Sequence, residues 1–147
     1  MPYRLLSWWY SQVGHSLGGA LAELDSLFMK LNLPADTTVR GVTFGTPRVG
    51  NQAWAQYFDS QVPDFTRMNN MHDPVPVVPG RDHFHYRHPS GEIHIEADGS
   101  AVFCPSEYPY LSCAFGVRAD VFYQPPTMTR THNAAIKWCR TFSGTDI

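Results

Sequence analysis

The sequence predicts an α/β fold with a mostly parallel sheet, and three observations carry this prediction. Candidate strands and helices alternate along the chain as far as Asp73, which is the order that builds parallel sheets. A G-x-S-x-G pentapeptide, Gly14–Gly18, stands between the first strand and the first helix. The 147 residues are 43% hydrophobic and 16% charged, which is enough apolar mass for the core of one domain.

The first strand and the first helix flank this pentapeptide. Leu5–Val13 is rich in aromatic residues and is expected to be the strand, although three polar residues weaken its pattern. The helix is expected to begin at Leu17 and to end before Pro34. Its apolar positions are Leu17, Ala20, Leu21, Leu24, Leu27, Phe28 and Leu31. This spacing predicts one apolar face of an amphipathic helix of roughly four turns.

Two further strands and one helix complete the alternating part of the chain. Val39–Phe44 contains β-branched residues and is expected to be a strand that ends at Gly45–Pro47. Asn51–Ser60 is expected to be a helix, and Phe65–Met68 a third short strand. These elements predict a three-stranded parallel core.

After Asp73 the sequence changes character. The prolines at positions 74, 76 and 79 forbid a helix there and favour an extended loop. His83–Tyr86 and Glu92–Glu96 are expected to be strands of a hairpin around the turn Pro89–Gly91. From about residue 105 onward no clean periodicity is visible, and the last helix candidate, Asn133–Arg140, is short.

Composition excludes several classes of protein. The net charge is −2, so there is no basic surface for nucleic acid or anionic membranes. No run of 18 apolar residues predicts a transmembrane helix, and Met1–Tyr10 is a poor signal peptide. Three cysteines are too few for a disulfide scaffold. Cys104 and Cys113 are close enough to close a small loop, with Cys139 left over, which hints at an oxidising compartment.

The pentapeptide has the residues that a nucleophilic serine requires. Ser16 on a sharp strand-to-helix turn is expected to have a strained backbone that pushes its hydroxyl into a cleft. Gly14 and Gly18 lack a Cβ, so neighbouring chain can pass closely. The positive end of the following helix and the backbone N–H of Leu17 would stabilise an oxyanion. The alternative is an ordinary turn that matches the pattern by chance.

Four segments resemble one family in the same order. Gly14–Ala22 closely resembles the nucleophile turn of the fungal triacylglycerol lipases, or class 3 lipases, which have the α/β-hydrolase fold. Val42–Asn51 resembles the family's next strand and loop, and Asn69–Pro79 resembles the segment that carries the catalytic aspartate. Tyr86–Ile95 resembles the hairpin after it. The resemblance covers about residues 12–104, whereas residues 105–147 diverge.

This resemblance implies a catalytic triad. Ser16 would be the nucleophile and Asp73 the acid. Asp73 also follows a short strand at the carboxyl edge of the predicted sheet, where such folds build their sites, although an aspartate before proline is also a common turn former. The chain order in this fold is Ser, Asp, His, and only His132 lies beyond the hairpin. We therefore assign His132 as the base, although its flanking residues depart from the family pattern.

The remaining histidines and the cysteines allow two further interpretations. His83, His85 and His88 could offer imidazoles to a metal, but no nearby cysteine or acid completes a recognised site. We therefore expect surface or hydrogen-bonded histidines, no metal and no cofactor. Cys104 and Cys113 match a small disulfide loop of the family, and the alternative is two free, partly buried thiols.

The resemblance implies a secreted carboxylic-ester hydrolase that acts on acylglycerols at a lipid–water interface. A feruloyl esterase of the same fold and an inactive lipase fragment are the alternatives, and the oligomeric state is left open.

Only 13 residues precede Gly14, where the family has a long region with several strands, a lid helix and a second oxyanion donor. We therefore expect residues 1–147 to be the C-terminal part of a lipase domain, with an exposed sheet edge, and expect the chain alone not to be a competent lipase.

Overall fold

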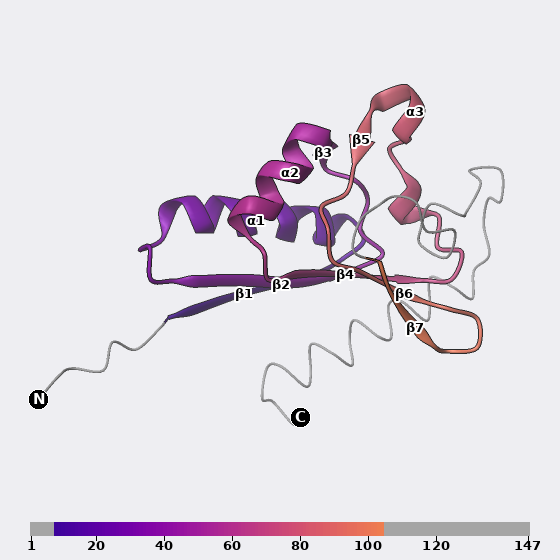
Figure 1. Ribbon diagram of the computed structural model, residues 1–147, viewed down its shortest axis with the longest axis horizontal. Coiled ribbons are helices and arrows are strands. Elements are labelled where there is room, and N and C mark those ends of the chain that lie inside the picture. The colour runs from indigo at the N-terminus through magenta and orange to yellow at the C-terminus, as the bar shows by residue number, and fades with distance from the viewer. Residues whose placement is uncertain (1–7, 105–147) are drawn as a thin grey trace, which may run out of the picture.

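A computed structural model describes residues 8–104, which form a five-stranded sheet with helices packed on it (Figure 1). The strand order is β1-β2-β4-β6-β7. The strands are β1 (Trp9–His15), β2 (Thr38–Phe44), β4 (Phe65–Asn70), β6 (Glu92–Ile95) and β7 (Ala101–Cys104). The first four are parallel and β7 is antiparallel to β6, so the mostly parallel α/β fold is confirmed. The expected three parallel strands were too few, since β6 and β7 extend the sheet.

Two helices lie on the same side of this sheet (Figure 1). They are α1 (Leu17–Asn32) and α2 (Gln52–Gln61), close to the predicted ranges. Asn51 caps α2, because its side chain accepts a hydrogen bond from the backbone N–H of Trp54. The core between helices and sheet consists of Leu27, Val39, Phe58, Val62 and Phe65. The rings of Phe58 and Phe65 pack edge to face, with centroids 4.9 Å apart.

The apolar face that the spacing predicts for α1 is present, but most of its large residues are exposed. Ala20 and Leu27 are buried, but five others are exposed. These five are Leu17, Leu21, Leu24, Phe28 and Leu31. The buried side of the helix carries mostly small or polar residues, namely Gly19, Ala20, Ala22, Glu23, Ser26 and Leu27. Small residues allow α1 to lie close to the strands, and the long side chains therefore point away from them.

The expected hairpin between His83–Tyr86 and Glu92–Glu96 is also wrong. Four of these residues divide among a short helix, α3 (Arg81–Phe84), a left-handed His85 and the two-residue strand β5 (Tyr86–Arg87). β5 pairs with β3 (Gly50–Asn51), not with β6. β6 pairs in parallel with β4, whose edge is available. Gly91 has a φ of +83° and lies against the carbonyl oxygen of Phe65, where a Cβ would not fit. The expected turn is therefore the place where the chain passes close to β4 before it enters β6.

The proline-rich segment is not fully extended. Its residues Val75–Val77 form one turn of 3-10 helix, η1, with proline in its first turn, where the missing N–H is tolerated. The range Leu5–Val13 was placed too early, because β1 runs from Trp9 to His15, and residues before 8 lie outside the described part. The helix candidate Asn133–Arg140 and the whole divergent tail also lie outside it, and the single-domain assignment stays a prediction.

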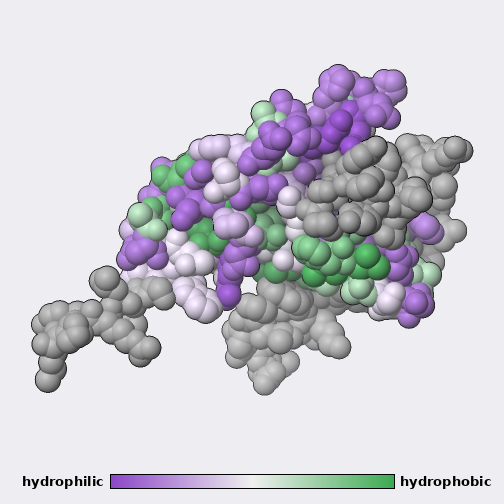
Figure 2. Space-filling model, in the orientation of Figure 1, coloured by the Kyte–Doolittle hydropathy of each residue, from purple (hydrophilic) through white to green (hydrophobic). Residues whose placement is uncertain are grey.

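The surface of the described residues is mixed. Figure 2 shows hydrophilic residues over α3 at the top of the view and hydrophobic patches lower on the same face. Within residues 8–104, no helix has the length and hydropathy needed to cross a membrane.

Candidate active site

Ser16 lies on the turn between β1 and α1 with a backbone conformation that serine rarely adopts. Its φ is 55° and its ψ is −127°, outside the common regions for residues other than glycine. The turn holds this conformation through two backbone hydrogen bonds. The Ser16 N–H donates to the carbonyl of Phe44 at 2.9 Å, and the Gly19 N–H donates to the carbonyl of Ser16 at 2.9 Å. The strained turn that the pentapeptide predicts is therefore present, and it is anchored to the neighbouring strand β2.

The glycines around Ser16 differ in what they do. A Cβ on Gly14 would collide with the carbonyl group of Gly18, as expected. A Cβ on Gly18 would meet nothing within 4 Å, so the prediction that both motif glycines permit close passage is wrong for Gly18. The second tight position is Gly19, where a Cβ would collide with the side chain of Thr46. Close packing of the first turn of α1 against the β2 loop therefore depends on Gly19, which the five-residue pattern does not include.

The N-terminus of α1 begins directly behind Ser16. Leu17 is the first residue of the helix, where a backbone N–H has no acceptor within the helix. The helix dipole adds partial positive charge at the same end. A negatively charged oxygen formed beside Ser16 would therefore meet both a backbone donor and a favourable field.

Asp73 lies three residues beyond the end of β4, at the same carboxyl edge of the sheet as Ser16. Its side chain is only 4% exposed. Its Oδ1 accepts a hydrogen bond from the backbone N–H of Val75 at 3.0 Å, so Asp73 also forms the turn that was the alternative interpretation. Burial raises the pKa of the Asp73 carboxyl, while the Val75 N–H and the charge of His15 lower it. The influence of His15, the neighbour of Ser16, indicates that the two loops lie near each other.

Two buried side chains hold the segment that follows Asp73. The guanidinium Nη1 of Arg48 donates to the carbonyls of Val77 and Pro79, and the Arg48 backbone N–H donates to Val78. The Nε2–H of His88 donates to the carbonyl of Pro76 at 2.8 Å. The four carbonyls at positions 76 to 79 therefore all have donors, although prolines prevent a regular ladder here. Neither residue was singled out for this role from the sequence, because its signal is a contact between distant segments.

Burial strongly lowers the pKa of His88, and the charges of Arg67 and Arg48 lower it further. His88 is therefore neutral in the folded protein. This agrees with the expectation of a hydrogen-bonded histidine. His83 and His85 are exposed and do not share the face of a strand, as the metal interpretation required. No group of three His, Cys, Asp or Glu side chains within residues 8–104 could hold a metal ion.

A row of buried polar side chains crosses the sheet below the candidate site. Thr43, Arg67 and Glu92 are partners in register on β2, β4 and β6. Arg67 donates from Nε and Nη2 to the carbonyl of Pro89, and its Nη2 lies 3.6 Å from Glu92 Oε2. All three are at most 1% exposed. Arg67 therefore holds the segment next to His88 from below, and the support of the Asp73 loop reaches into the core.

Two of the predicted site residues lie outside the described part of the chain. These are His132 and Cys113. The structure places Ser16, Leu17 and Asp73 beyond the carboxyl ends of β1 and β4, and the triad itself stays a prediction. Cys104 at the end of β7 is buried and disulfide-bonded, and its partner lies beyond residue 104. The alternative that Cys104 is a free thiol is therefore wrong, while the pairing with Cys113 stays a prediction.

Comparison with known proteins gives a consistent result. The sequence profile of the family described as Lipase (class 3) matches residues 11–83. A secreted mono- and diacylglycerol lipase, LIP2 of Malassezia restricta, is 37% identical over 120 residues, which are 81% of this chain and 37% of that protein. The chain thus spans well under half the length of this relative.

Solved structures agree with the sequence relatives. Lipase II from Rhizopus niveus matches with a TM-score of 0.68 and 30% identity, covering 80% of this chain and 44% of that one. A triacylglycerol lipase whose catalytic centre is described as a serine protease triad matches with a TM-score of 0.64 and 31% identity, covering 75% and 43%. The fold is therefore that of the α/β-hydrolases, and residues 11–83 belong to the class 3 lipase family.

Proposed function

We propose that this chain carries the nucleophile and the acid of a serine carboxylic-ester hydrolase that acts on acylglycerols. The observation that carries the proposal is Ser16, held at positive φ between β1 and the N-terminus of α1. Strain of this kind persists only where the surrounding structure enforces it, and it clusters at functional sites. The relatives named as acylglycerol lipases support the substrate class, and the name of LIP2 supports secretion.

The proposed reaction is acyl transfer through a covalent intermediate. Ser16 Oγ forms a bond to the ester carbonyl carbon while a histidine, assigned as His132, takes its proton. The carbonyl oxygen gains the negative charge beside the Leu17 N–H and the positive end of α1. The C–O bond to the alcohol then breaks, and the histidine returns the proton to the leaving oxygen. Water hydrolyses the acyl-enzyme by the same steps.

Asp73 has the second role in this proposal. Its carboxylate would accept the other ring N–H of the histidine and stabilise the imidazolium. The Val75 N–H and the contacts of Arg48 and His88 support this role, because they hold the Asp73 loop in one conformation. The burial that raises the pKa of Asp73 also strengthens the attraction between its carboxylate and a positive imidazole close by, because less water screens the two charges.

The test uses covalent labelling, which reports on the nucleophile separately from lipase turnover. We expect a fluorophosphonate probe to label the folded chain at Ser16, located by peptide mass spectrometry, and labelling to disappear in Ser16→Ala. Asp73→Asn should slow labelling by about 10³–10⁴-fold, because the base loses its orienting partner. Asp64→Asn, a change at an exposed carboxylate, is the matched control and should label at the normal rate. A folded chain whose Ser16 reacts no faster than its exposed serines would refute the assignment.

Substrate assays then address the alternatives. Hydrolysis of tributyrin but not of methyl ferulate, lost in Ser16→Ala, would support an acylglycerol substrate over a feruloyl ester. The expectation that the chain alone is not a competent lipase stays a prediction, and robust tributyrin hydrolysis by the 147 residues would contradict it without touching the role of Ser16.

A further inference from the structure

The loop that leaves β2, residues 44–48, contacts the turn that carries Ser16. The carbonyl of Phe44 accepts a hydrogen bond from the Ser16 N–H at 2.9 Å. Two residues further along, Thr46 is fully buried, and its hydroxyl would collide with a Cβ placed on Gly19. The loop therefore holds the strained turn by a hydrogen bond at Ser16 and by close packing at the first turn of α1.

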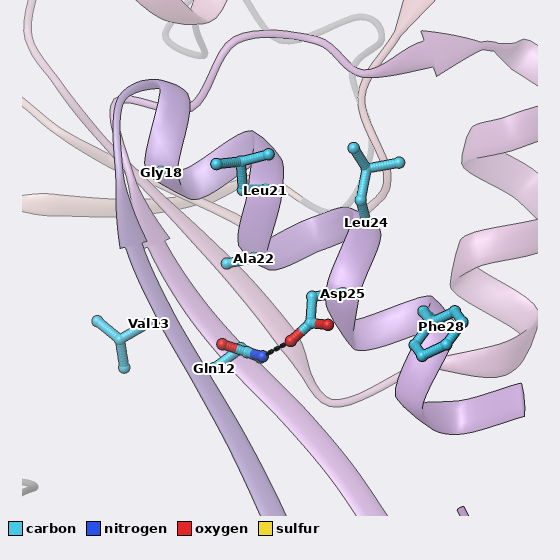
Figure 3. Close-up of a pocket in the computed structure, with 8 residues that line it drawn as sticks. All are labelled: Gln12, Val13, Gly18, Leu21, Ala22, Leu24, Asp25 and Phe28. Carbon is cyan, nitrogen blue, oxygen red and sulfur yellow. Dashed lines mark hydrogen bonds between the residues drawn. The ribbon is translucent and has the colours of Figure 1, made fainter. Parts of the chain in front are cut away.

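The same end of α1 is open on another side. Gly18 and Leu21 line a pocket of about 560 Å³ beside β1 (Figure 3). A Cβ on Gly18 would meet nothing within 4 Å. The close packing that fixes this end of α1 against the neighbouring loop therefore lies on the side of Gly19 and Thr46, and not on the side of the pocket.

The far end of the loop holds the segment that follows Asp73. The backbone N–H of Arg48 donates to the carbonyl of Val78 at 2.8 Å, and its guanidinium Nη1 donates to the carbonyls of Val77 and Pro79. One buried residue thus binds three consecutive carbonyls. The guanidinium is planar and rigid, so it restricts the carbonyls that it binds more than a flexible ammonium would.

Asp73 is joined to these carbonyls by the short helix η1. The carboxylate of Asp73 accepts the Val75 N–H at 3.0 Å, and the Val78 N–H donates to the Val75 carbonyl at 3.2 Å. Val75 therefore binds the carboxylate with its N–H and the stretch held by Arg48 with its carbonyl. A displacement of Val78 would move Val75, and the carboxylate with it.

This backbone connects Arg48 to Asp73, and the charge of Arg48 does not. The influences on the pKa of the Asp73 carboxyl are burial, which raises it, and the Val75 N–H and the charge of His15, which lower it. An arginine beside the carboxylate would lower the pKa as well, and Arg48 is not one of these influences. Arg48 therefore acts on the position of Asp73.

Given the roles proposed for Ser16 and Asp73, we propose that Arg48 is a positioning residue that sets the place of the Asp73 carboxylate relative to Ser16. Its loop is fixed to the nucleophile turn at one end and to the acid segment at the other. His88 also donates to the acid segment, at Pro76, but it precedes β6, whose neighbours in the sheet are β4 and β7. The spacing has to be held closely, since a misplacement of about 1 Å can cost about 100-fold in rate.

The first test is the rate at which a fluorophosphonate probe labels Ser16 in the full 147-residue chain. We expect Arg48→Met to label about 10–100-fold more slowly than the parent. In an Asp73→Asn background the same change should cost less than about twofold, because a residue that acts through Asp73 then has nothing to position. Arg40→Met removes an arginine that is bonded to Ser11, away from the carboxyl end of β2, and this matched control should label at the parent rate.

A second measurement does not need a reactive serine. We expect the pKa of the Asp73 carboxyl, followed by NMR titration, to move toward its ordinary value in Arg48→Met, because a displaced segment admits water. In Arg40→Met it should stay raised. Arg48→Lys keeps a positive donor and should lie between the parent and Arg48→Met in both measurements. It also keeps the test decisive if circular dichroism shows that Arg48→Met does not fold.

Two results would overturn the proposal. One is an Asp73 pKa that responds to neither Arg48 variant. The other is an equal loss of labelling rate in the parent and Asp73→Asn backgrounds, which an arginine with a purely structural role would give. A parent chain whose Ser16 is not labelled, but whose Asp73 pKa responds to Arg48, would refute the proposed function and still support the positioning of Asp73 by Arg48.

Discussion

Glu23 is a carboxyl group buried at the contact between α1 and α2, and we expect its removal to change how stability depends on pH. Its side chain is 0% exposed. Oε1 accepts a hydrogen bond from Trp54 Nε1 at 2.9 Å, and Oε2 has no hydrogen-bond partner among the described residues. Burial raises the pKa of Glu23 from 4.5 to about 7, although the Trp54 hydrogen bond and the charge of Arg67 oppose the shift. The perturbation is Glu23→Gln, which keeps the shape and removes the titration.

The size of the effect follows from this shift. In the unfolded chain Glu23 loses its proton near pH 4.5, whereas in the folded protein it keeps the proton up to about pH 7. Between these values the folded state binds more protons, so the free energy of unfolding falls as pH rises. The contribution is complete below pH 4.5 and is lost by about pH 7. It amounts to roughly 3 kcal/mol, at about 1.4 kcal/mol for each pKa unit.

The assay is thermal unfolding by circular dichroism at pH 5, 6, 7 and 8. At pH 5 we expect Glu23→Gln to unfold within a few degrees of the parent chain. At pH 8 we expect it to be more stable, with a relative gain of roughly 6–12 °C in Tm, since 1 kcal/mol shifts the Tm of a chain of this size by about 2–4 °C. Glu96→Gln, at a carboxylate outside the core, is the matched control and should follow the parent at every pH. Parallel curves for the parent and Glu23→Gln would refute the reasoning.

Three further predictions concern other parts of the chain. Gly14→Ala should destabilise the fold by several kcal/mol, because the new Cβ would collide with the Gly18 carbonyl. Gly18→Ala should stabilise α1 by up to about 1 kcal/mol, because its Cβ would meet nothing. Equal effects of the two changes in urea unfolding would contradict the packing described for the turn. Because the pKa of His88 is lowered in the folded protein, only the unfolded chain takes up the proton, and the free energy of unfolding should fall as pH drops below about 6.5. His88→Gln should flatten this part of the pH profile. An unchanged slope would count against a neutral buried imidazole. Peptide mapping without reduction should link Cys104 to Cys113, and a link to the third cysteine instead would overturn that pairing.

Signals within one segment predicted the fold well. The end of α1, the strand β2 and the start of α2 lie within about two residues of the predicted ranges. The strained turn at Ser16 was also predictable, because the pentapeptide stands between a strand and a helix and Gly14 lies where a Cβ would not fit. These features depend on residues close together in the chain, so one sequence is enough to find them.

Pairing between distant segments was not predictable in the same way. The strand after Gly91 has the alternation of a hairpin strand, but its partner is β4, more than twenty residues earlier. The support of the Asp73 loop by Arg48 and His88 also depends on which segments meet in space. Nothing in the neighbouring sequence indicates either contact. A carbonyl without a partner in its own segment can accept a hydrogen bond from any donor that folding brings close to it.

Two features of α1 differ from an ordinary amphipathic helix: most of its large apolar residues are exposed, and Glu23 is buried. One physical cause accounts for both. Gly19 packs against Thr46 without room for a Cβ, so the first turn of α1 lies very close to the sheet. A helix this close leaves space for small side chains below it, and the large ones turn outward. The apolar periodicity therefore predicted the helix correctly, although most of the stripe does not lie against the sheet. Glu23 fills part of the buried side with a carboxyl group whose charge is disfavoured by burial, and most of the large apolar side chains of the stripe stay exposed on the other side of α1.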